Sequence, residues 1–208
     1  MTISWNPKPV DSASSGIEVL PDGRLRCWIE HETLHGVTPT MLAWWFRHLE
    51  GHMEFEEQHV SRYHVWHPRD HIAVSYTRRL ADGSVGVGAQ LHIVEMFGGN
   101  PRYKGNARSD IVRLDERGFG HRPRWFGLQV AAMDYCFAPV PEGTRYANSL
   151  TIGFPSKLAK PLNVLLRRFV FNTARANAWI RHNIEEVGQF ERFLPALFTS
   201  ETNESQPD

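Results

Sequence analysis

Five residues near the C-terminal end, HNIEE from His182 to Glu186, have types and spacing that could bind a metal. An α-helix turns by about 100° per residue, so His182 and Glu186 would lie on one face, roughly 6 Å apart along the axis. An imidazole and a carboxylate placed in this way can share one divalent cation. Spacing alone is weak support, because His52 and Glu56 repeat it and the chain holds 11 His and 23 acidic residues.

The neighbourhood of this pair favours the metal interpretation. Seven residues at helical spacing form one stripe that is apolar apart from the pair: Ala174, Ala178, His182, Glu186, Phe190, Phe193 and Leu197. Ionisable side chains within a buried stripe need partners, and the small alanines would leave room for a ligand. The element that must position the pair is therefore a long helix, which we expect from Pro161 to Phe198.

Two further candidate ligands lie on predicted strands. The segment from Ser84 to Phe97 alternates apolar and polar residues, and Glu95 ends its apolar face. A carboxylate there is costly unless it is paired or bound to metal, so we predict a ligand, with a buried ion pair or a solvent-exposed strand end as alternatives. His71 begins a strand that runs to Arg78, directly after the rigid turn HPRD, so the direction of its side chain would be fixed.

The rest of the chain indicates an α+β protein. The expected elements are an arm (1–15), a hairpin (18–30), a helix capped by Thr38 and ending at Gly51, strands at 60–66, 125–137 and 144–153, and a long loop or lid at 97–120. Strands and helices are segregated, and a sheet curled round the long helix would leave a cavity. We expect one domain over 1–198 and a disordered tail over 199–208.

Composition narrows the class of partner. The 23 basic and 23 acidic residues cancel, which argues against bulk attraction to nucleic acid or to a membrane. The aromatic content of 12% fits an aromatic cavity or, equally, an ordinary aromatic core. Cys27 and Cys136 are expected to be free thiols, and the N-terminal sequence does not resemble a signal peptide, which predicts a cytoplasmic protein. No apolar stretch is long enough to span a membrane.

Three stretches, TPTMLAWWF, RYHVWHPRDH and HNIEEVGQFERFLPALF, occur in this order and together resemble the 2,4-diacetylphloroglucinol hydrolase family. The resemblance covers roughly Val37 to Phe198. It implies the helix-grip fold of Bet v 1 and START proteins, in which a curved antiparallel sheet surrounds a long C-terminal helix. It also implies a zinc ion bound by two His and two Glu, and hydrolysis of the carbon–carbon bond between an acyl group and an aromatic ring.

Carried over by position, the resemblance implies the metal ligands His71, Glu95, His182 and Glu186. It implies that Tyr63 contacts substrate or transfers a proton, with Tyr135 a further candidate for both roles and Tyr146 a candidate substrate contact. The chain departs from the family where an Asn is expected shortly after the first His, since it has Ile72-Ala73-Val74 there. This departure concerns the substrate more than the metal.

The sequence thus predicts a zinc-dependent hydrolase that cleaves the ring–acyl bond of a small acylated phenol or aromatic polyketide. Mn²⁺ or Fe²⁺ would also accept these ligand types. A binding protein that holds such a molecule without turnover is the alternative from another class, and a cyclase or dehydratase on the same scaffold is a third. The expected partner is a small aromatic substrate, with neither nucleic acid nor membrane, and a homodimer is compatible with the sequence.

Overall fold

The computed structural model describes residues 3–203. Its strands are β1 (Ala13–Val19), β2 (Leu25–His31), β3 (Leu34–His35), β4 (His52–Phe55), β5 (Gln58–Ser61), β6 (His71–Arg78), β7 (Gln90–Met96), β8 (Lys104–Asp115), β9 (Gly118–Trp125), β10 (Leu128–Gln129), β11 (Ala131–Val140) and β12 (Gly143–Ile152). Its helices are α1 (Pro39–Trp45), α2 (Arg62–Trp66), α3 (Lys160–Leu165) and α4 (Thr173–Asn203). Short helical turns are η1 (Val10–Ser12), η2 (Phe97–Gly99), η3 (Pro101–Tyr103), η4 (Lys157–Ala159) and η5 (Leu166–Val170).

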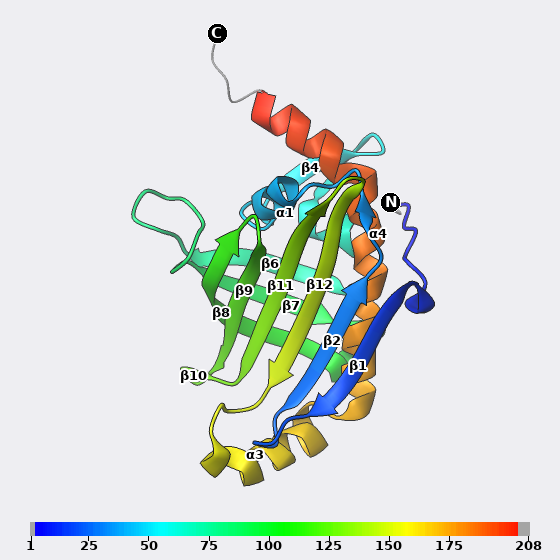
Figure 1. Cartoon of the computed structure of the whole chain (residues 1–208). Helices are drawn as coiled ribbons and strands as arrows, with labels where there is room; N and C mark the ends of the chain where they lie inside the picture. The colour runs from blue at the N-terminus through cyan, green and yellow to red at the C-terminus, as the bar shows by residue number, and fades with distance from the viewer. Residues whose placement is uncertain (1–2, 204–208) are drawn as a thin grey trace.

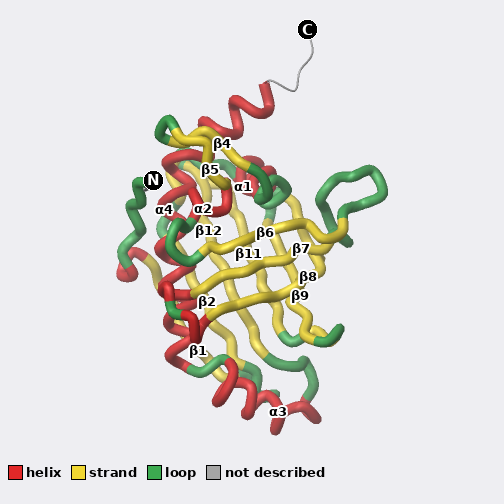
Figure 2. Tube along the Cα trace, turned by 180° about the vertical axis from the view of Figure 1, so that it is seen from behind, coloured by secondary structure: helices red, strands yellow, loops and turns green. Residues whose placement is uncertain are grey.

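One large antiparallel sheet forms most of the molecule. Its strand order is β1-β2-β12-β11-β9-β8-β7-β6, with β10 paired to β9 and β3 to β12. The strands curve so that β6 and β7 cross β11 and β12, passing behind them in Figure 1 and in front of them in the reversed view of Figure 2. β4 and β5 form a separate hairpin. The predicted α+β class with a curved antiparallel sheet is confirmed.

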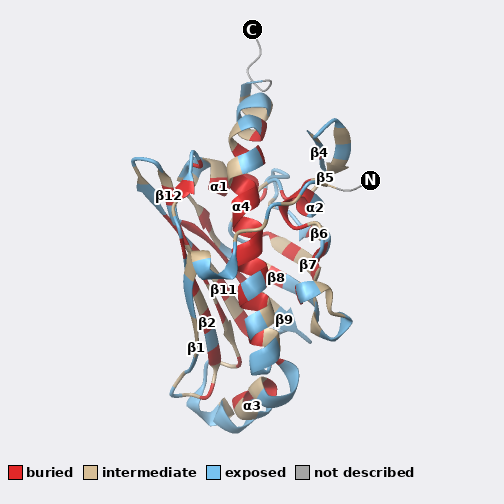
Figure 3. Cartoon of the chain, turned by 90° about the vertical axis from the view of Figure 1, so that its right-hand side faces the viewer, coloured by how far each residue is buried: buried red, intermediate tan, exposed pale blue. Residues whose placement is uncertain are grey.

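Helix α4 lies along the concave side of this sheet, and its middle part is buried (Figure 3). Every residue from 182 to 190 is buried, because the helix contacts the sheet on one side and α1 and α2 on another. Phe190 shows how this core is built, since its ring lies against Trp45, Trp66 and Tyr146. The long C-terminal helix is therefore the central element of the fold, as predicted.

The predicted long helix is interrupted near its start. Its first part is α3 and the single π-helical turn η5, which ends at Phe171 with φ −130° and ψ 68°. Asn172 then caps α4, because its side-chain oxygen accepts a hydrogen bond from the backbone of Arg175 at 3.0 Å. At the other end α4 continues to Asn203, so residues 199–203 of the expected tail are helical. Residues 204–208 of that tail, and 1–2 of the expected arm, lie outside the described part of the chain.

Other sequence predictions were also wrong. The helix expected to end at Gly51 is α1, which ends at Trp45, and the expected arm (1–15) includes η1 and the start of β1. The predicted strand at 60–66 ends at Ser61 and is followed by the short helix α2, in which the amide of His67 bonds to the carbonyl of Tyr63 at 3.4 Å. The predicted loop at 97–120 contains all of β8 and the start of β9, with β8 paired in continuous register to β7. The strand expected from Ser84 begins only at Gln90, and Val87 is 59% exposed rather than inward.

Candidate metal centre

Two of the candidate ligands come from one face of α4. His182 and Glu186 are 2% and 1% exposed, and the His182 Nε2 atom lies 3.5 Å from the Glu186 Oε2 atom. The i, i+4 spacing places them one helical turn apart, on the side of the helix that faces β6 and β7. Both side chains therefore point into the interior, where neither can be satisfied by bulk water.

The other two candidates lie directly opposite each other on neighbouring strands. His71 begins β6 and is the register partner of Glu95 near the end of β7. The His71 Nε2 atom lies 3.7 Å from Glu95 Oε1 and 3.3 Å from Glu186 Oε2. The structure thus brings all four predicted side chains together, two from the sheet and two from the helix. Ligand atoms of His71, His182 and Glu186 all lie within 4.8 Å of one another.

Hydrogen bonds fix which nitrogen each imidazole presents to this group. His71 Nδ1–H donates to the carbonyl oxygen of Tyr63 at 2.8 Å, and His182 Nδ1–H donates to Asp70 Oδ2 at 3.1 Å. The lone pairs of both rings are therefore on Nε2, facing the carboxylates. Among the described residues, the buried atoms His71 Nε2 and Glu186 Oε1 have no hydrogen-bond partner. A cation between them would satisfy both atoms.

Electrostatics at this site also favour a cation. Burial raises the pKa of Glu95 to about 7 and that of Glu186 well above its usual range, to which neighbouring carboxylates contribute. Burial lowers the pKa of His182 to about 4 and holds that of His71 far below its usual range. Neutral imidazoles are the form that binds metal, and a bound dication would favour the ionised carboxylates. Two His and two Glu are a donor set that suits Zn²⁺.

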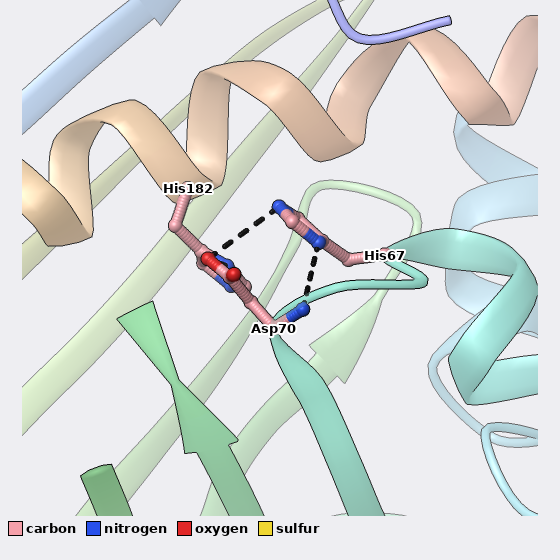
Figure 4. Close-up of side chains that lie close together, drawn as sticks. All are labelled: His67, Asp70 and His182. Atoms are coloured by element: carbon pink, nitrogen blue, oxygen red, sulfur yellow. Dashed lines mark hydrogen bonds and ion pairs between the residues drawn. The ribbon is translucent and has the colours of Figure 1, made fainter. Parts of the chain in front are cut away.

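Asp70 is a functional candidate that the sequence reasoning missed. It lies next to His71 in the chain and holds His182 from the turn before β6, where His67 lies beside both (Figure 4). Its two oxygens also accept the amides of Gly98 and Gly99, at 2.7 and 2.9 Å. Although burial alone would raise it, hydrogen bonds from His182 and Arg69 hold the pKa of Asp70 well below its usual range. The aspartate in the motif WHPRDH was the available signal.

Replacement of Asp70 by Asn should weaken metal binding without abolishing it. The variant keeps the shape of the side chain but loses the charge that orients His182 and raises the basicity of its Nε2 atom. Loss of such a partner typically costs about 10–100-fold in metal affinity. Competition with a chromogenic zinc chelator measures the change. An unchanged affinity would show that His182 needs no orienting carboxylate.

Tyr63 lies beside the four side chains. Its hydroxyl donates to Glu95 Oε1 at 2.5 Å, and its ring stacks on His71 with centroids 3.8 Å apart and planes 1° from parallel. It is 2% exposed, and burial together with Glu95 raises its pKa well above the usual value. Tyr63 therefore carries its proton at neutral pH, close to the candidate ligands.

A cavity of about 450 Å³ opens next to the site, between the sheet and α4. Tyr63, Glu95, His182 and Glu186 line one part of it, and aliphatic and aromatic side chains line most of the remainder. Tyr135, a predicted substrate contact, also lines the cavity. Tyr146 is fully buried against Phe137 and is not among the residues that line it. A molecule in the cavity would thus meet Tyr63 and Tyr135 but not Tyr146.

His121 is a second residue that the sequence reasoning missed. It lies on β9, lines the cavity and is 6% exposed, and its Nδ1 atom has no hydrogen-bond partner in the described part of the chain. Burial lowers the pKa of His121 to about 3, so the imidazole is neutral. It was missed because it lies between the predicted loop, which ends at Gly120, and the strand predicted from Trp125, and was assigned to neither.

Burial of neutral His121 should make stability depend on pH. Its pKa is about 3 when folded against an ordinary value of 6.5, so its contribution is complete above pH 6.5 and is lost as pH falls toward 3. When the pH falls from 7.5 to 5.0, the unfolding free energy of the wild type should therefore fall by about 2 kcal/mol more than that of His121→Leu. Urea denaturation at both pH values measures this. Equal losses in the two proteins would contradict the assignment of a neutral buried imidazole.

The fold and the geometry together define the class of protein. A curved antiparallel sheet closed by one long C-terminal helix, with a cavity between them, is a helix-grip α+β architecture. None of the helices in residues 3–203 has the length and apolarity needed to cross a bilayer.

Comparison with known families gives a match to the first half of the chain. The family model described as "DAPG hydrolase PhiG domain" matches residues 6–105, the part that contains Tyr63, His71 and Glu95. Over these residues the chain is similar to the diacetylphloroglucinol (DAPG) hydrolase family, in agreement with the resemblance found in the sequence. His182 and Glu186 lie beyond the matched residues.

The solved structures that resemble this chain have low sequence identity to it. No curated protein matches the chain. A START superfamily protein from Mycobacterium smegmatis is 13% identical, covers 84% of this chain and 98% of its own, and has a TM-score of 0.49. A protein from Mesorhizobium loti is 11% identical, covers 81% of this chain and 98% of its own, and has a TM-score of 0.45. These scores are too low to support an argument, so the fold assignment depends on the sheet order and helix described above.

Proposed function

We propose that the protein is a zinc-dependent hydrolase that cleaves the carbon–carbon bond between an acyl group and a phenolic ring. The observation that carries the proposal is the convergence of His71, Glu95, His182 and Glu186 beside a largely apolar cavity. The match of residues 6–105 to the DAPG hydrolase family model supports it. The substrate would be a small acylated phenol or aromatic polyketide.

The four side chains would hold the metal, and two imidazoles with two carboxylates are donor types that suit Zn²⁺. Zn²⁺ bound there would act as a Lewis acid that polarises the acyl carbonyl. The candidate ligands His182, Glu95 and Glu186 line the cavity itself, so a substrate could approach them. A purely structural metal would need no such access.

Hydrolysis requires one proton on the ring carbon and one hydroxyl group on the acyl carbon, both supplied overall by one water. In our proposal Tyr63 holds the proton at its hydroxyl, and Glu95, which accepts the hydrogen bond from that hydroxyl, exchanges protons with it. The apolar walls would orient the ring and exclude further water, and Tyr135 would contact a ring substituent.

The alternative is a protein that binds an aromatic ligand without turnover, which the largely apolar lining of the cavity also allows. One experiment separates the two functions. The untreated protein is incubated with a panel of mono- and diacylated phenols, and products are resolved by chromatography with mass detection. Release of the deacylated phenol and the carboxylic acid in equal amounts supports the hydrolase. Saturable binding without either product supports the carrier and rejects the hydrolase.

A further inference from the structure

One end of the molecule carries an unusual number of exposed apolar side chains. Among the described residues, eight large apolar side chains are more than half exposed, and six of these lie on two segments. These six, which we call the apolar rim, are Trp125, Phe126, Leu128, Leu158, Leu165 and Phe169. The two segments are the β9–β10 hairpin and the run from η4 to η5, which lie toward the same end of the fold (Figure 1).

The rim adjoins the cavity. Trp125 of the hairpin and Leu166 and Val170 of η5 line the same cavity as the candidate metal ligands. Whatever covers the rim would therefore lie close to the cavity. Scattered exposed apolar residues are ordinary, but six at one end of a molecule favour an interaction surface there.

The tip of the hairpin gives independent support. Phe126 and Gly127 have φ of 48° and 78°, and they connect the paired residues Trp125 and Leu128. Such a two-residue turn favours Asn-Gly, because an aromatic residue with positive φ is strained. Phe126 nevertheless occupies the position and is 89% exposed. The strained backbone conformation does not bury the Phe126 side chain within the chain. This indicates that the side chain contacts another molecule.

The charged residues around the rim indicate the chemistry of its partner. Between Glu142 and Glu185 the sequence contains seven Lys and Arg residues and no acidic residue. Lys157, Lys160, Arg167 and Arg168 alternate with the apolar residues of the rim, and none of the four has an ion pair among the described residues. The whole chain has zero net charge, but this segment carries a local excess of positive charge.

We infer that the apolar rim docks on the surface of an anionic lipid membrane. Aromatic and aliphatic side chains would enter the interface while the interleaved cations contact lipid headgroups. A symmetric contact with a second copy is disfavoured, because it would bring like charges together. The inference departs from the expectation of no membrane partner, which considered only net charge. It does not depend on the proposed reaction, although it would let an apolar ligand pass directly from membrane to cavity.

Vesicle co-sedimentation of the full chain tests the inference. Vesicles of phosphatidylcholine alone are compared with vesicles containing about one third phosphatidylglycerol, at low and high salt. Binding is expected only to the anionic vesicles and should weaken with salt. Phe126→Asn should lower the partition coefficient at least about tenfold while suiting the turn better than Phe. Lys157→Glu with Lys160→Glu should lower it by more than about fivefold per residue.

The matched control is Val87→Ser, which removes a 59% exposed apolar side chain from the β6–β7 loop and should bind like the wild type. Thermal denaturation of each variant verifies folding. Absence of wild-type binding to anionic vesicles would overturn the inference, as would equal binding by Phe126→Asn and the wild type. If the wild type does not bind vesicles but forms a concentration-dependent dimer that Phe126→Asn dissociates, the rim is a contact with a second copy and the inference is overturned. The inference is also overturned if the protein does not bind vesicles but is captured by an acidic protein.

Discussion

His182→Ala should remove both the bound metal and the hydrolase activity. The Nε2 atom of His182 faces Glu186 and has its tautomer fixed by Asp70, so the variant loses one of the two imidazole ligands of the proposed site. Loss of an orienting partner alone costs about 10–100-fold in metal affinity, and loss of the ligand itself should exceed that range. We expect zinc to fall from about one ion per chain to less than a tenth, measured by elemental analysis after gel filtration.

The control for this variant is His59→Ala, because the side chain of His59 is 69% exposed and lies on β5. It should retain metal and activity at wild-type level. If His182→Ala is poorly folded by circular dichroism, Glu186→Gln provides the same test with a side chain of the same shape. Metal retained at wild-type level by a folded His182 or Glu186 variant would contradict the ligand assignment.

Tyr63→Phe should lose activity while it keeps its metal. The substitution removes only the hydroxyl, so the ring can still stack on His71 and the four candidate ligands remain. Loss of a positioned proton donor typically lowers the rate by about 10²–10⁴-fold. The measurement is kcat with an acylphenol substrate that the screen identifies, together with zinc content on the same preparation.

Tyr76→Phe is the matched control for the tyrosine. Tyr76 is 8% exposed, and its hydroxyl also makes one hydrogen bond, to the carbonyl of Phe46 at 2.7 Å. Its loss should cost about 0.5–1.5 kcal/mol of stability with little effect on kcat. If Tyr63→Phe keeps full activity, the proton comes from elsewhere, and Tyr135 or His121 in the cavity lining would be the next candidate.

The parts of the fold with strong local signals could be predicted from the sequence. The turn HPRD and the β-rich segment after it place β6 at His71–Arg78, and alternation along β7 gives Glu95 its inward direction. β8 was missed because its glycine, asparagine and charged residues lack apolar alternation, and its pairing with β7 and β9 forms the strand. α2 was missed because five residues are too few to show a helical period.

The site shows the same division between local and tertiary information. Spacing on a helix and position on a strand are local properties, so they indicated the four candidate ligands. The role of Asp70 depends on a contact with His182, 112 residues away in the chain, which no local pattern encodes. His121 faces the cavity only because β9 pairs with both β8 and β11. The break before α4 depends on one capping side chain, Asn172.

The most direct test of the metal centre is anomalous X-ray diffraction, at the zinc edge, from crystals of the protein purified without added metal or chelator. We expect one strong peak per chain, within bonding distance of His71 Nε2, His182 Nε2 and the carboxylates of Glu95 and Glu186. A map with no peak among these four side chains, or with zinc bound only elsewhere, would contradict the account.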